Sequence, residues 1–285
     1  MIRGTTRLTA VVGWPVDHSR SPQMLNAAFA ATSIDAVMVP LGVEPDEFMC
    51  VVAGLRAARA LGASVTVPHK VVAVAACSEL SPAALAIGAV NCLQLIDDRV
   101  VGHNTDCDGF LDGLVSGGFD RAALPITRVV VLGAGGAARA VTYGLRAAGS
   151  IRLIARRPEV ADWFKARSDG SRRLLAWTAS NIHDAFANSD LVVDCTPIGL
   201  GGADEASLVD ALPIDILPRG TRVASLVYHR PTLLLERARS AGHAVIDGRA
   251  MLVHQGARAF TIWTRRPAPV EVMQNALDDA LRSGT

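Results

Sequence analysis

The residues best suited to chemistry follow short β-branched runs, at points where strands are expected to end. Lys70 comes after the run Ser64–Val67 and a proline, and Asp106 closes the polar segment Gly102–Asp106. An ammonium group can donate a proton, and a nearby carboxylate favours its charged form, so this pair is suited to general acid–base catalysis. A lone lysine after a strand is usually a surface charge, so the hypothesis depends on the neighbouring polar segments.

Two of these segments supply small hydrogen-bonding groups. Asn91 offers an amide that both donates to and accepts from a sugar-like hydroxyl. Ser19 and Ser21 precede a predicted helix, and Ser21 followed by Pro22 is typical of a helix N-cap. Two hydroxyls at a helix N-terminus could also bind a small carboxylate, and both interpretations of Ser21 stay open. Together these groups favour a polyhydroxylated ligand over an apolar one.

A glycine-rich turn, Gly133–Ala138, lies between a predicted buried strand, Val129–Leu132, and a predicted helix. Glycine at 133 allows a tight turn, and glycine at 135 lets backbone N–H groups approach a pyrophosphate. A small residue at Ala138 lets the helix pack closely, and the helix N-terminus supplies positive potential. The context predicts a dinucleotide site, although a tight turn without a ligand has the same pattern.

The end of the next predicted strand, Ile151–Ala155, bears on which dinucleotide binds. NAD-binding proteins usually place a carboxylate there, whereas this chain has Arg156 and Arg157. Guanidinium groups suit a ribose 2′-phosphate, so the sequence predicts NADP. The alternative is NAD, with Glu159 on the ribose hydroxyl and both arginines merely solvated.

These residues need a scaffold of alternating strands and helices. Alternating runs in the first part of the chain predict strands over 8–12, 37–41 and 63–67 and helices over 22–32 and 45–61. From Arg128 on, strands are predicted over 129–132, 151–155, 191–195 and 222–227, with a helix to about 148 and a glycine-rich loop over 198–202. The stretch 269–283 predicts an amphipathic docking helix. The class is therefore α/β, with mostly parallel sheets and right-handed crossovers.

Length and composition limit the functional classes. A chain of 285 residues favours two domains, and a net charge of +1 gives no reason to expect nucleic acid or an anionic membrane. The apolar runs are too short for a membrane span or a signal peptide. Five scattered cysteines without a C-x-x-C pair indicate a reducing compartment, so we expect a cytoplasmic protein. Four histidines show no ligand spacing, and no metal site is predicted: His18, His69, His103 and His254.

Eight motifs, in order from about residue 10 to residue 264, make the chain resemble the shikimate dehydrogenases of the shikimate/quinate dehydrogenase family. They are GWPVDHSRSP, SVTVPHK, GAVN, GHNTDCDG, VLGAGGAARA, CTPIGL, LVY and GRAMLVHQGARAFTIWT. The resemblance implies NADPH-dependent reduction of 3-dehydroshikimate to shikimate, a step of aromatic amino-acid biosynthesis. It also implies a substrate-binding domain of residues 1–106 and 248–285, to which the C-terminal helix returns, and an NADP-binding Rossmann domain of residues 107–247.

Residue roles follow from the same resemblance. Lys70 and Asp106 would be the catalytic pair. The substrate would be bound by Ser19, Ser21, Thr66, Lys70, Asn91, Asp106, Tyr228 and Gln255. The cofactor would be bound by Gly133, Ala134, Gly135, Gly136, Ala137, Arg156, Arg157, Leu226 and Gly248.

Some positions depart from the family pattern, and they leave alternatives open. Trp14 replaces a usual asparagine, the cofactor loop reads ARRPE where NRT is common, and Ser225 replaces a usual aspartate. The substrate could therefore be quinate or an aminated relative of shikimate. A non-catalytic sensor of dinucleotide and metabolite is a further alternative, although a sensor needs no proton donor. We expect a monomer or a homodimer.

Overall fold

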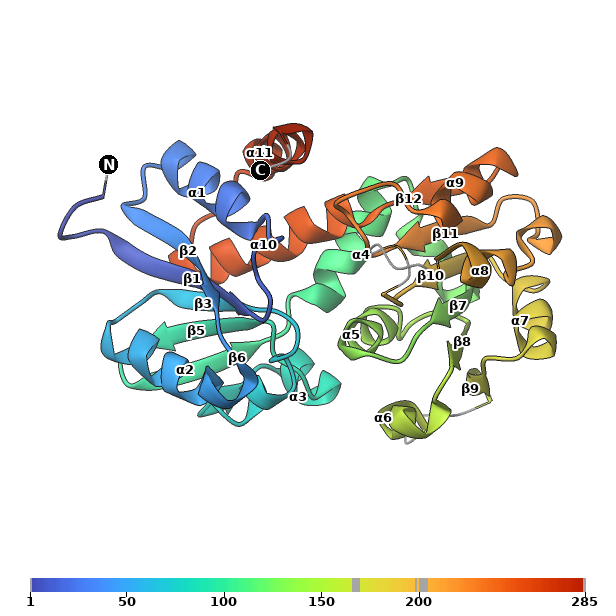
Figure 1. The fold of residues 1–285 in the computed structure, drawn as a ribbon, viewed down its shortest axis with the longest axis horizontal. Helices are drawn as coiled ribbons and strands as arrows, with labels where there is room; N and C mark the ends of the chain where they lie inside the picture. Colours follow the sequence, from blue (N-terminus) through green and yellow to red (C-terminus); the bar gives the residue numbers. More distant parts are fainter. Residues whose placement is uncertain (1, 166–169, 198, 200–204, 284–285) are drawn as a thin grey trace. The chain divides into compact units, whose positions relative to one another are not determined.

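The computed structural model describes residues 2–165, 170–197, 199 and 205–283. The chain forms two compact units: unit 1 is Met1–Phe110 with Leu252–Thr285, and unit 2 is Leu111–Met251 (Figure 1). The functional assignment of the predicted domains, 1–106 with 248–285 and 107–247, stays a prediction. The loop expected over 198–202 lies outside the described residues except for Gly199.

Unit 1 is built on a six-stranded sheet in the order β2-β1-β3-β5-β6-β4. Its strands are β1 (Arg7–Gly13), β2 (Ala36–Gly42), β3 (Gly62–Val65), β4 (Glu79–Leu80), β5 (Cys92–Ile96) and β6 (Arg99–His103). Strand β1 pairs in parallel with β2 and β3, and β4 pairs in parallel with β6. Strand β5 is antiparallel to both of its neighbours. A two-residue turn, with Asp97 at φ 50°, joins β5 to β6 and requires a hairpin there.

Helices cover both faces of this sheet because successive strand residues point to opposite sides. Val11 belongs to a core with α1 (Ser21–Ala31), α10 (Gly248–Thr264) and α11 (Val270–Ser283), whereas Ala10 and Val12 belong to a core with α2 (Phe48–Ala57) and α3 (Pro82–Ile87). The first core contains Leu25, Phe29, Phe260, Met273 and Leu277. The docking helix predicted over 269–283 is thereby confirmed.

Two predicted boundaries in unit 1 are wrong. The helix expected to Leu61 ends at Ala57, because Arg59 is left-handed at φ 53° and Leu61 N donates to Leu8 O in the sheet. The strand expected to Val67 ends at Val65. The chain therefore leaves the sheet two residues earlier than predicted and approaches Lys70 through a turn.

Unit 2 is a parallel six-stranded sheet in the order β12-β11-β10-β7-β8-β9. Its strands are β7 (Arg128–Leu132), β8 (Ser150–Ala155), β9 (Arg172–Ala176), β10 (Leu191–Asp194), β11 (Arg222–Ser225) and β12 (Ala244–Ile246). The chain progresses outward from β7 in one direction and then from β10 in the other. That reversal is the topological switch point of a doubly wound fold, where ligands bind at the carboxyl ends of the strands.

The helices of unit 2 pack on this sheet against side chains that point alternately to its two faces. Val130 and Leu132 of β7 share a core with α7 (Ala179–Phe186), α8 (Glu205–Asp210) and α9 (Leu233–Ser240). The glycine turn is followed by α5 (Gly136–Gly144), which ends four residues before the predicted boundary. The remaining helices are α4 (Asp106–Ser116), which spans the boundary between the units, and α6 (Asp162–Lys165). Short 3-10 turns are η1 (Pro45–Glu47), η2 (Val72–Val74), η3 (Arg121–Ile126), η4 (Pro158–Ala161) and η5 (Ile214–Ile216).

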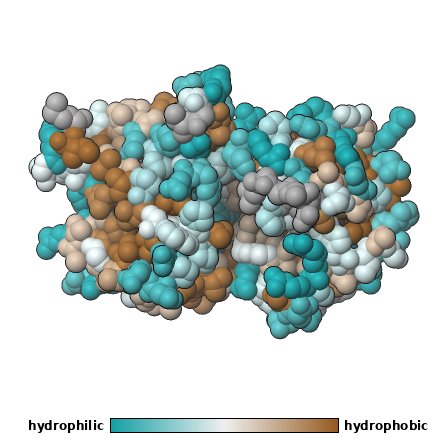
Figure 2. All heavy atoms as spheres, in the orientation of Figure 1, coloured by the Kyte–Doolittle hydropathy of each residue, from teal (hydrophilic) through white to brown (hydrophobic). Residues whose placement is uncertain are grey.

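The surface of each unit mixes hydrophilic and hydrophobic residues on the face shown in Figure 2. Among the described helices, none combines the length and the apolarity that crossing a bilayer would require.

Candidate active site

Lys70 and Asp106 meet in unit 1, although 36 positions separate them in the sequence. Lys70 Nζ lies 2.7 Å from Asp106 Oδ2, and the two side chains are 19% and 6% exposed. The structure thus brings together the two residues predicted as the reaction pair. The ammonium is the more accessible partner, as a proton donor must be.

The turn before Lys70 is fixed by a buried histidine. His69 is fully buried, its ring stacks on Phe48 at a centroid distance of 4.8 Å, and its Nε2 donates to Val43 O at 2.8 Å. On the other side, Val90 N donates to Lys70 O at 2.7 Å. These contacts hold the Lys70 backbone from both sides, so the side chain has a defined starting point.

Asn91 connects the pair to the rest of the site. Its Nδ2 donates to Asp106 Oδ1 at 2.8 Å, and its Oδ1 accepts from Thr105 N at 2.6 Å. Nδ2 also lies 3.0 Å from Thr105 Oγ1 and 3.4 Å from Gln255 Oε1. Asn91 is 3% exposed, so the amide is a buried positioning group as well as a potential ligand contact. Sequence reasoning missed Thr105, although it lies within the quoted segment GHNTDCDG.

Gln255 reaches this cluster because α10 passes very close to α4. A Cβ atom on Gly109 would lie 2.6 Å from Gln255 N and 2.7 Å from Gln255 Cβ, so only glycine fits there. Asp106 lies one turn before Gly109 on α4. The close approach therefore brings the α10 amide to the start of α4.

Ser19 and Ser21 lie at the start of α1, but the N-cap interpretation of Ser21 is wrong. Helix α1 begins at Ser21, and Arg20 occupies the N-cap position without a side-chain cap bond. The Ser19 hydroxyl instead accepts from Ser21 N at 3.4 Å, and Ser21 is buried. Proline at position 22 had suggested a helix starting one residue later. Thr66 lies just beyond β3, where its N donates to Val12 O at 2.9 Å.

Unit 2, considered by itself, has a candidate cofactor site at its switch point. Gly133 follows β7 with φ +96°, in the left-handed region that favours glycine, and its N donates to Ile154 O at 2.8 Å. Gly135 is the N-cap of α5, and a Cβ atom on it would meet nothing within 4 Å. The α5 N-terminus thus opens onto free space, as an anion-binding turn requires.

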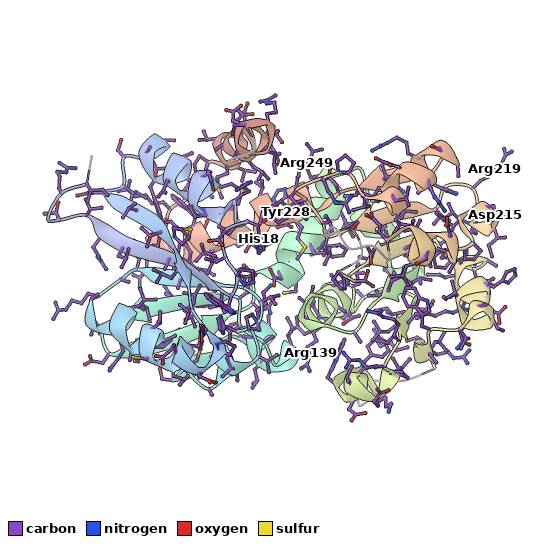
Figure 3. The ribbon with its side chains drawn as sticks, in the orientation of Figure 1. His18, Arg139, Asp215, Arg219, Tyr228 and Arg249 are labelled. Atoms are coloured by element: carbon purple, nitrogen blue, oxygen red, sulfur yellow. The ribbon has the colours of Figure 1, made fainter. Side chains whose placement is uncertain are left out.

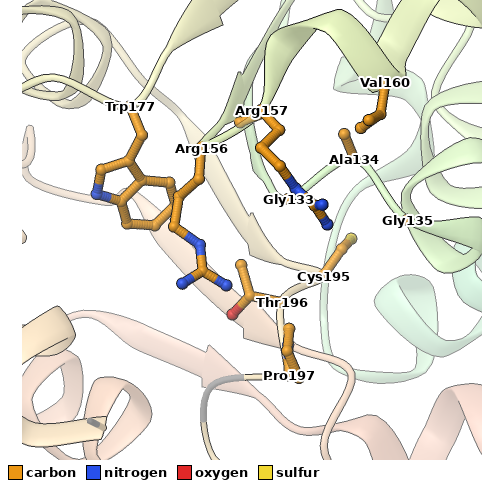
Figure 4. A pocket seen from close by; sticks show the side chains of 11 residues that line it. Gly133, Ala134, Gly135, Arg156, Arg157, Val160, Trp177, Cys195, Thr196 and Pro197 are labelled. Atoms are coloured by element: carbon orange, nitrogen blue, oxygen red, sulfur yellow. The ribbon is translucent and has the colours of Figure 1, made fainter.

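This turn lines a pocket of about 210 Å³ (Figure 4). Of the nine predicted cofactor residues, five line it: Gly133, Ala134, Gly135, Arg156 and Arg157. The other four do not: Gly136, Ala137, Leu226 and Gly248. The other lining residues are Ala155, Val160, Trp177, Cys195, Thr196 and Pro197. Cys195, Thr196 and Pro197 lie in the quoted CTPIGL motif. No sequence signal pointed to Trp177, because the stretch that contains β9 showed no clear pattern.

Glu159, the residue that would have favoured NAD, is exposed in η4 and does not line the pocket. Both arginine side chains extend into it in Figure 4. The geometry therefore favours the 2′-phosphate interpretation of this loop over the ribose-hydroxyl interpretation.

The remaining predicted residues of unit 2 follow β11. Leu226 N donates to Asp194 O at 3.2 Å, and Gly248 N donates to Val227 O at 3.0 Å. Leu226 and Gly248 are therefore neighbours at the start of α10. Tyr228, labelled in Figure 3, is half-buried, and its ring centroid lies 5.9 Å from that of His229.

A buried carboxyl group underlies the pocket. Asp194 is 2% exposed, and its Oδ1 accepts from Thr196 N at 2.9 Å and from Thr196 Oγ1 at 2.6 Å. Burial raises the pKa of Asp194 to about 6, against the opposing effect of the Thr196 hydrogen bonds. Within the described ranges, no group of three or more histidine, cysteine, aspartate or glutamate residues is arranged to hold a metal ion.

The strand order, the glycine turn and the arginines at the switch point define unit 2 as a member of the dinucleotide-binding class. Comparison with known proteins gives the family. Residues 11–93 match the shikimate dehydrogenase substrate binding domain, and residues 248–277 match the shikimate 5'-dehydrogenase C-terminal domain. The shikimate dehydrogenase (NADP(+)) of Moorella thermoacetica is 41% identical over 98% of this chain and 95% of its own.

Solved structures agree with this comparison. A shikimate dehydrogenase in complex with NADP+ superposes with a TM-score of 0.88 at 31% identity, covering 99% of this chain and 98% of its own. The Thermus thermophilus enzyme in complex with NADP(H) and shikimate gives a TM-score of 0.82 at 32% identity, covering 96% of this chain and 100% of its own. The chain belongs to the shikimate dehydrogenase family.

Proposed function

We propose that this protein reduces 3-dehydroshikimate to shikimate with NADPH, and catalyses the reverse reaction, in aromatic amino-acid biosynthesis. The observation that carries the proposal is the hydrogen-bonded cluster of Lys70, Asp106 and Asn91, in a chain whose second unit has an arginine-lined pocket. The family's named members support the substrate and the cofactor.

The residues of unit 2 fit NADP. The open backbone of Gly135 suits the pyrophosphate, and Arg156 and Arg157 suit the 2′-phosphate. When bound, the cofactor supplies a hydride to the carbonyl carbon of the substrate. The chain must then supply the proton for the carbonyl oxygen and hold the substrate in place.

Lys70 Nζ is the proposed proton donor. As the C=O bond becomes a C–O⁻ bond, the N–H bond of the ammonium breaks and its proton passes to that oxygen. Asp106 holds Lys70 in position through the 2.7 Å ion pair. In the oxidation direction neutral Lys70 must take the proton, so we expect oxidation to run better at higher pH.

The other predicted substrate residues would bind the ring and the acid group. Thr66, Asn91 and Gln255 supply hydrogen bonds to ring hydroxyls, and Ser19, Ser21 and Tyr228 supply them to the carboxylate. Residues 1–106 and 248–285 would form the substrate-binding domain, and residues 107–247 the NADP-binding domain.

We also propose a cytoplasmic location and a small-molecule enzyme that is a monomer or a homodimer and binds no nucleic acid. None of the five described cysteines forms a disulfide, which suits a reducing compartment. The net charge of +1 supplies no general attraction to polyanions.

The experiment is a spectrophotometric assay at the NADPH absorbance band with 3-dehydroshikimate, shikimate, quinate and an aminated shikimate, each with NADP and NAD. We expect the largest kcat/KM for the shikimate pair with NADP. A larger value for quinate or for the amine would reassign the substrate. Tight binding of NADPH and shikimate without turnover would make the protein a sensor and would overturn the proposal.

A further inference from the structure

Trp177 is the one aromatic residue among the described residues that line the unit 2 pocket. Its place is set by the sheet: β8 and β9 pair in parallel up to Ala155 and Ala176, and Trp177 N donates to Ala155 O at 2.9 Å. Trp177 therefore follows β9 directly beside Arg156, which follows β8. Figure 4 shows the indole next to the Arg156 side chain, on the side away from the Thr196 and Pro197 wall.

The indole also has a structural contact, which must be separated from any contact with a ligand. Thr178 is the N-cap of α7 and accepts from Asn181 N at 3.3 Å, so Trp177 is the residue before the cap. Half-buried, it packs against the core cluster that contains Ile182. Apolar residues at these two positions form a hydrophobic staple. A staple requires apolar volume only, so it leaves the aromatic face in the pocket unexplained.

We propose that Trp177 binds the adenine ring of the dinucleotide, with its indole stacked on the base. This rests on the proposed function only in taking the ligand to be NADP(H). The pyrophosphate belongs at the Gly133 turn and the 2′-phosphate at Arg156 and Arg157. The adenine is attached to that same phosphorylated ribose. Its place is therefore next to Arg156, where the pocket has Trp177.

A flat aromatic base stacks on aromatic side chains, and such contacts contribute substantially to binding without any contact to the 2′-phosphate. Trp177 is thus an adenine-binding residue, whereas the arginines read the 2′-phosphate. The competing role is indirect: the indole could stack on the Arg156 guanidinium and position it. The two roles differ in which ligands they affect.

The test uses equilibrium binding of 2′,5′-ADP and of 5′-AMP to the full chain, which requires no turnover of any acid substrate. Trp177→Leu keeps the apolar volume of the staple, and Trp177→Phe keeps an aromatic face. The matched control is Trp163→Leu, which removes an indole in the same unit that lies over Arg139 and does not line the pocket. Melting temperatures of all variants establish that they fold.

We expect Trp177→Leu to weaken both ligands by the same factor, roughly 5- to 50-fold, and Trp177→Phe to recover most of that loss. Trp163→Leu should leave both affinities unchanged. The affinity for reduced nicotinamide mononucleotide, which lacks the adenosine, should not change in Trp177→Leu. If Trp177→Leu loses affinity for 2′,5′-ADP but not for 5′-AMP, Trp177 positions Arg156 and the proposal is overturned. Wild-type affinity of Trp177→Leu for both ligands would also overturn it. If the wild type binds 2′,5′-ADP but turns over no shikimate, the proposed function fails while this inference stands.

Discussion

Asn91 and Lys70 bind opposite oxygens of the same carboxylate: Asn91 Nδ2 donates to Asp106 Oδ1 at 2.8 Å, and Lys70 Nζ contacts Oδ2 at 2.7 Å. The amide fixes the plane of the carboxylate, and the carboxylate in turn fixes the ammonium. A buried charge is costly when its partners are removed. The three residues should therefore respond to substitution as one unit rather than additively.

Lys70→Ala should lower kcat by roughly 10²–10⁴-fold with a smaller change in KM, because its proton transfer acts in the transition state. Steady-state kinetics in the reduction direction measures this. The chain has one other lysine, Lys165, which is half-exposed and paired with Asp162. Lys165→Ala is the matched control and should leave kcat unchanged. A Lys70→Ala enzyme that keeps more than half of the wild-type kcat would remove Lys70 from the mechanism.

Asp106→Asn should lower kcat at least about tenfold, because it breaks the ion pair that holds Lys70 and places an amide against the Asn91 amide. The control lies on the same helix: Asp108 contacts Arg258 at 3.5 Å and is half-exposed. Asp108→Asn should have little effect. Equal kinetic effects of the two substitutions would show that α4 tolerates no loss of charge anywhere and that Asp106 has no special role.

Ser19→Ala and Ser21→Ala should each raise the KM for the acid substrate and leave NADPH affinity unchanged. Because Ser21 is not the α1 cap, its substitution should not carry the loss expected of a cap. Ser81 provides the comparison, since its hydroxyl accepts from Ala84 N at 3.2 Å at the start of α3. Ser81→Ala should cost about 1 kcal/mol of stability with no change in KM. If Ser19→Ala and Ser21→Ala both bind the substrate normally, the substrate carboxylate lies elsewhere.

Replacing Arg156 and Arg157 together by alanine should reduce the preference for NADPH over NADH at least about tenfold, because charge-assisted hydrogen bonds to the 2′-phosphate are lost. NADH has no phosphate there, so its kcat/KM should hardly change. Arg156→Ala should be the more damaging single substitution, because that position matches the family's cofactor loop more clearly. The control is Glu159→Ala, at an exposed residue outside the pocket. If Glu159→Ala harms catalysis with NADH and the double variant harms nothing, the arginines are solvated and the cofactor assignment is wrong.

Asp194→Asn should stabilise the protein at neutral pH. The pKa of Asp194 in the folded protein is about 6, above the ordinary value of 3.8. Between these two values only the unfolded chain releases the proton. The free energy of unfolding is therefore highest below pH 3.8 and falls as the pH rises to about 6. The difference corresponds to about 3 kcal/mol as an upper limit. Urea unfolding at pH 4 and pH 7.5 measures the free energy of unfolding. Asp194→Asn should raise it at pH 7.5 and not at pH 4.

Asp190, the residue before β10, supplies the opposite case. Its pKa is lowered, first by the hydrogen bond from Arg128, so its carboxylate stabilises the fold above the unfolded pKa. Asp190→Asn should therefore destabilise the protein at pH 7.5. If Asp194→Asn also destabilises the protein at that pH, burial does not control Asp194.

The sequence predicted the alternating architecture and most strands to within two residues, because buried parallel strands such as Val129–Leu132 are continuous apolar runs. It could not predict the antiparallel pairing of β5. That pairing depends on the left-handed Asp97 in a two-residue turn, which no glycine marks. Helix ends were also missed where tertiary contacts decide them, as at Arg59.

Within the site, the residues in distinctive motifs could be named in advance, and the structure joins Lys70, Asn91, Asp106 and Gln255 in one cluster. Trp177 could not be found, because its role depends on the register of β8 against β9 rather than on any local pattern. Asp194 was missed for a related reason. Asp194 is the last residue of β10, where a carboxyl group is expected to face solvent, and only the packing of the folded chain shows that it is buried.

The division of unit 1 into two stretches of sequence determines the order in which the molecule can fold during synthesis. Its core joins Leu25 and Phe29 to Phe260, Met273 and Leu277, and Trp263 Nε1 donates to Leu93 O at 2.9 Å. Unit 2 is continuous and can complete its core as soon as residue 251 has left the ribosome. Until α10 and α11 follow, α1 alone of these three helices can cover that face of the first sheet in the nascent chain. The unit that is begun first is therefore completed last, and part of its apolar surface is exposed to solvent in the interval.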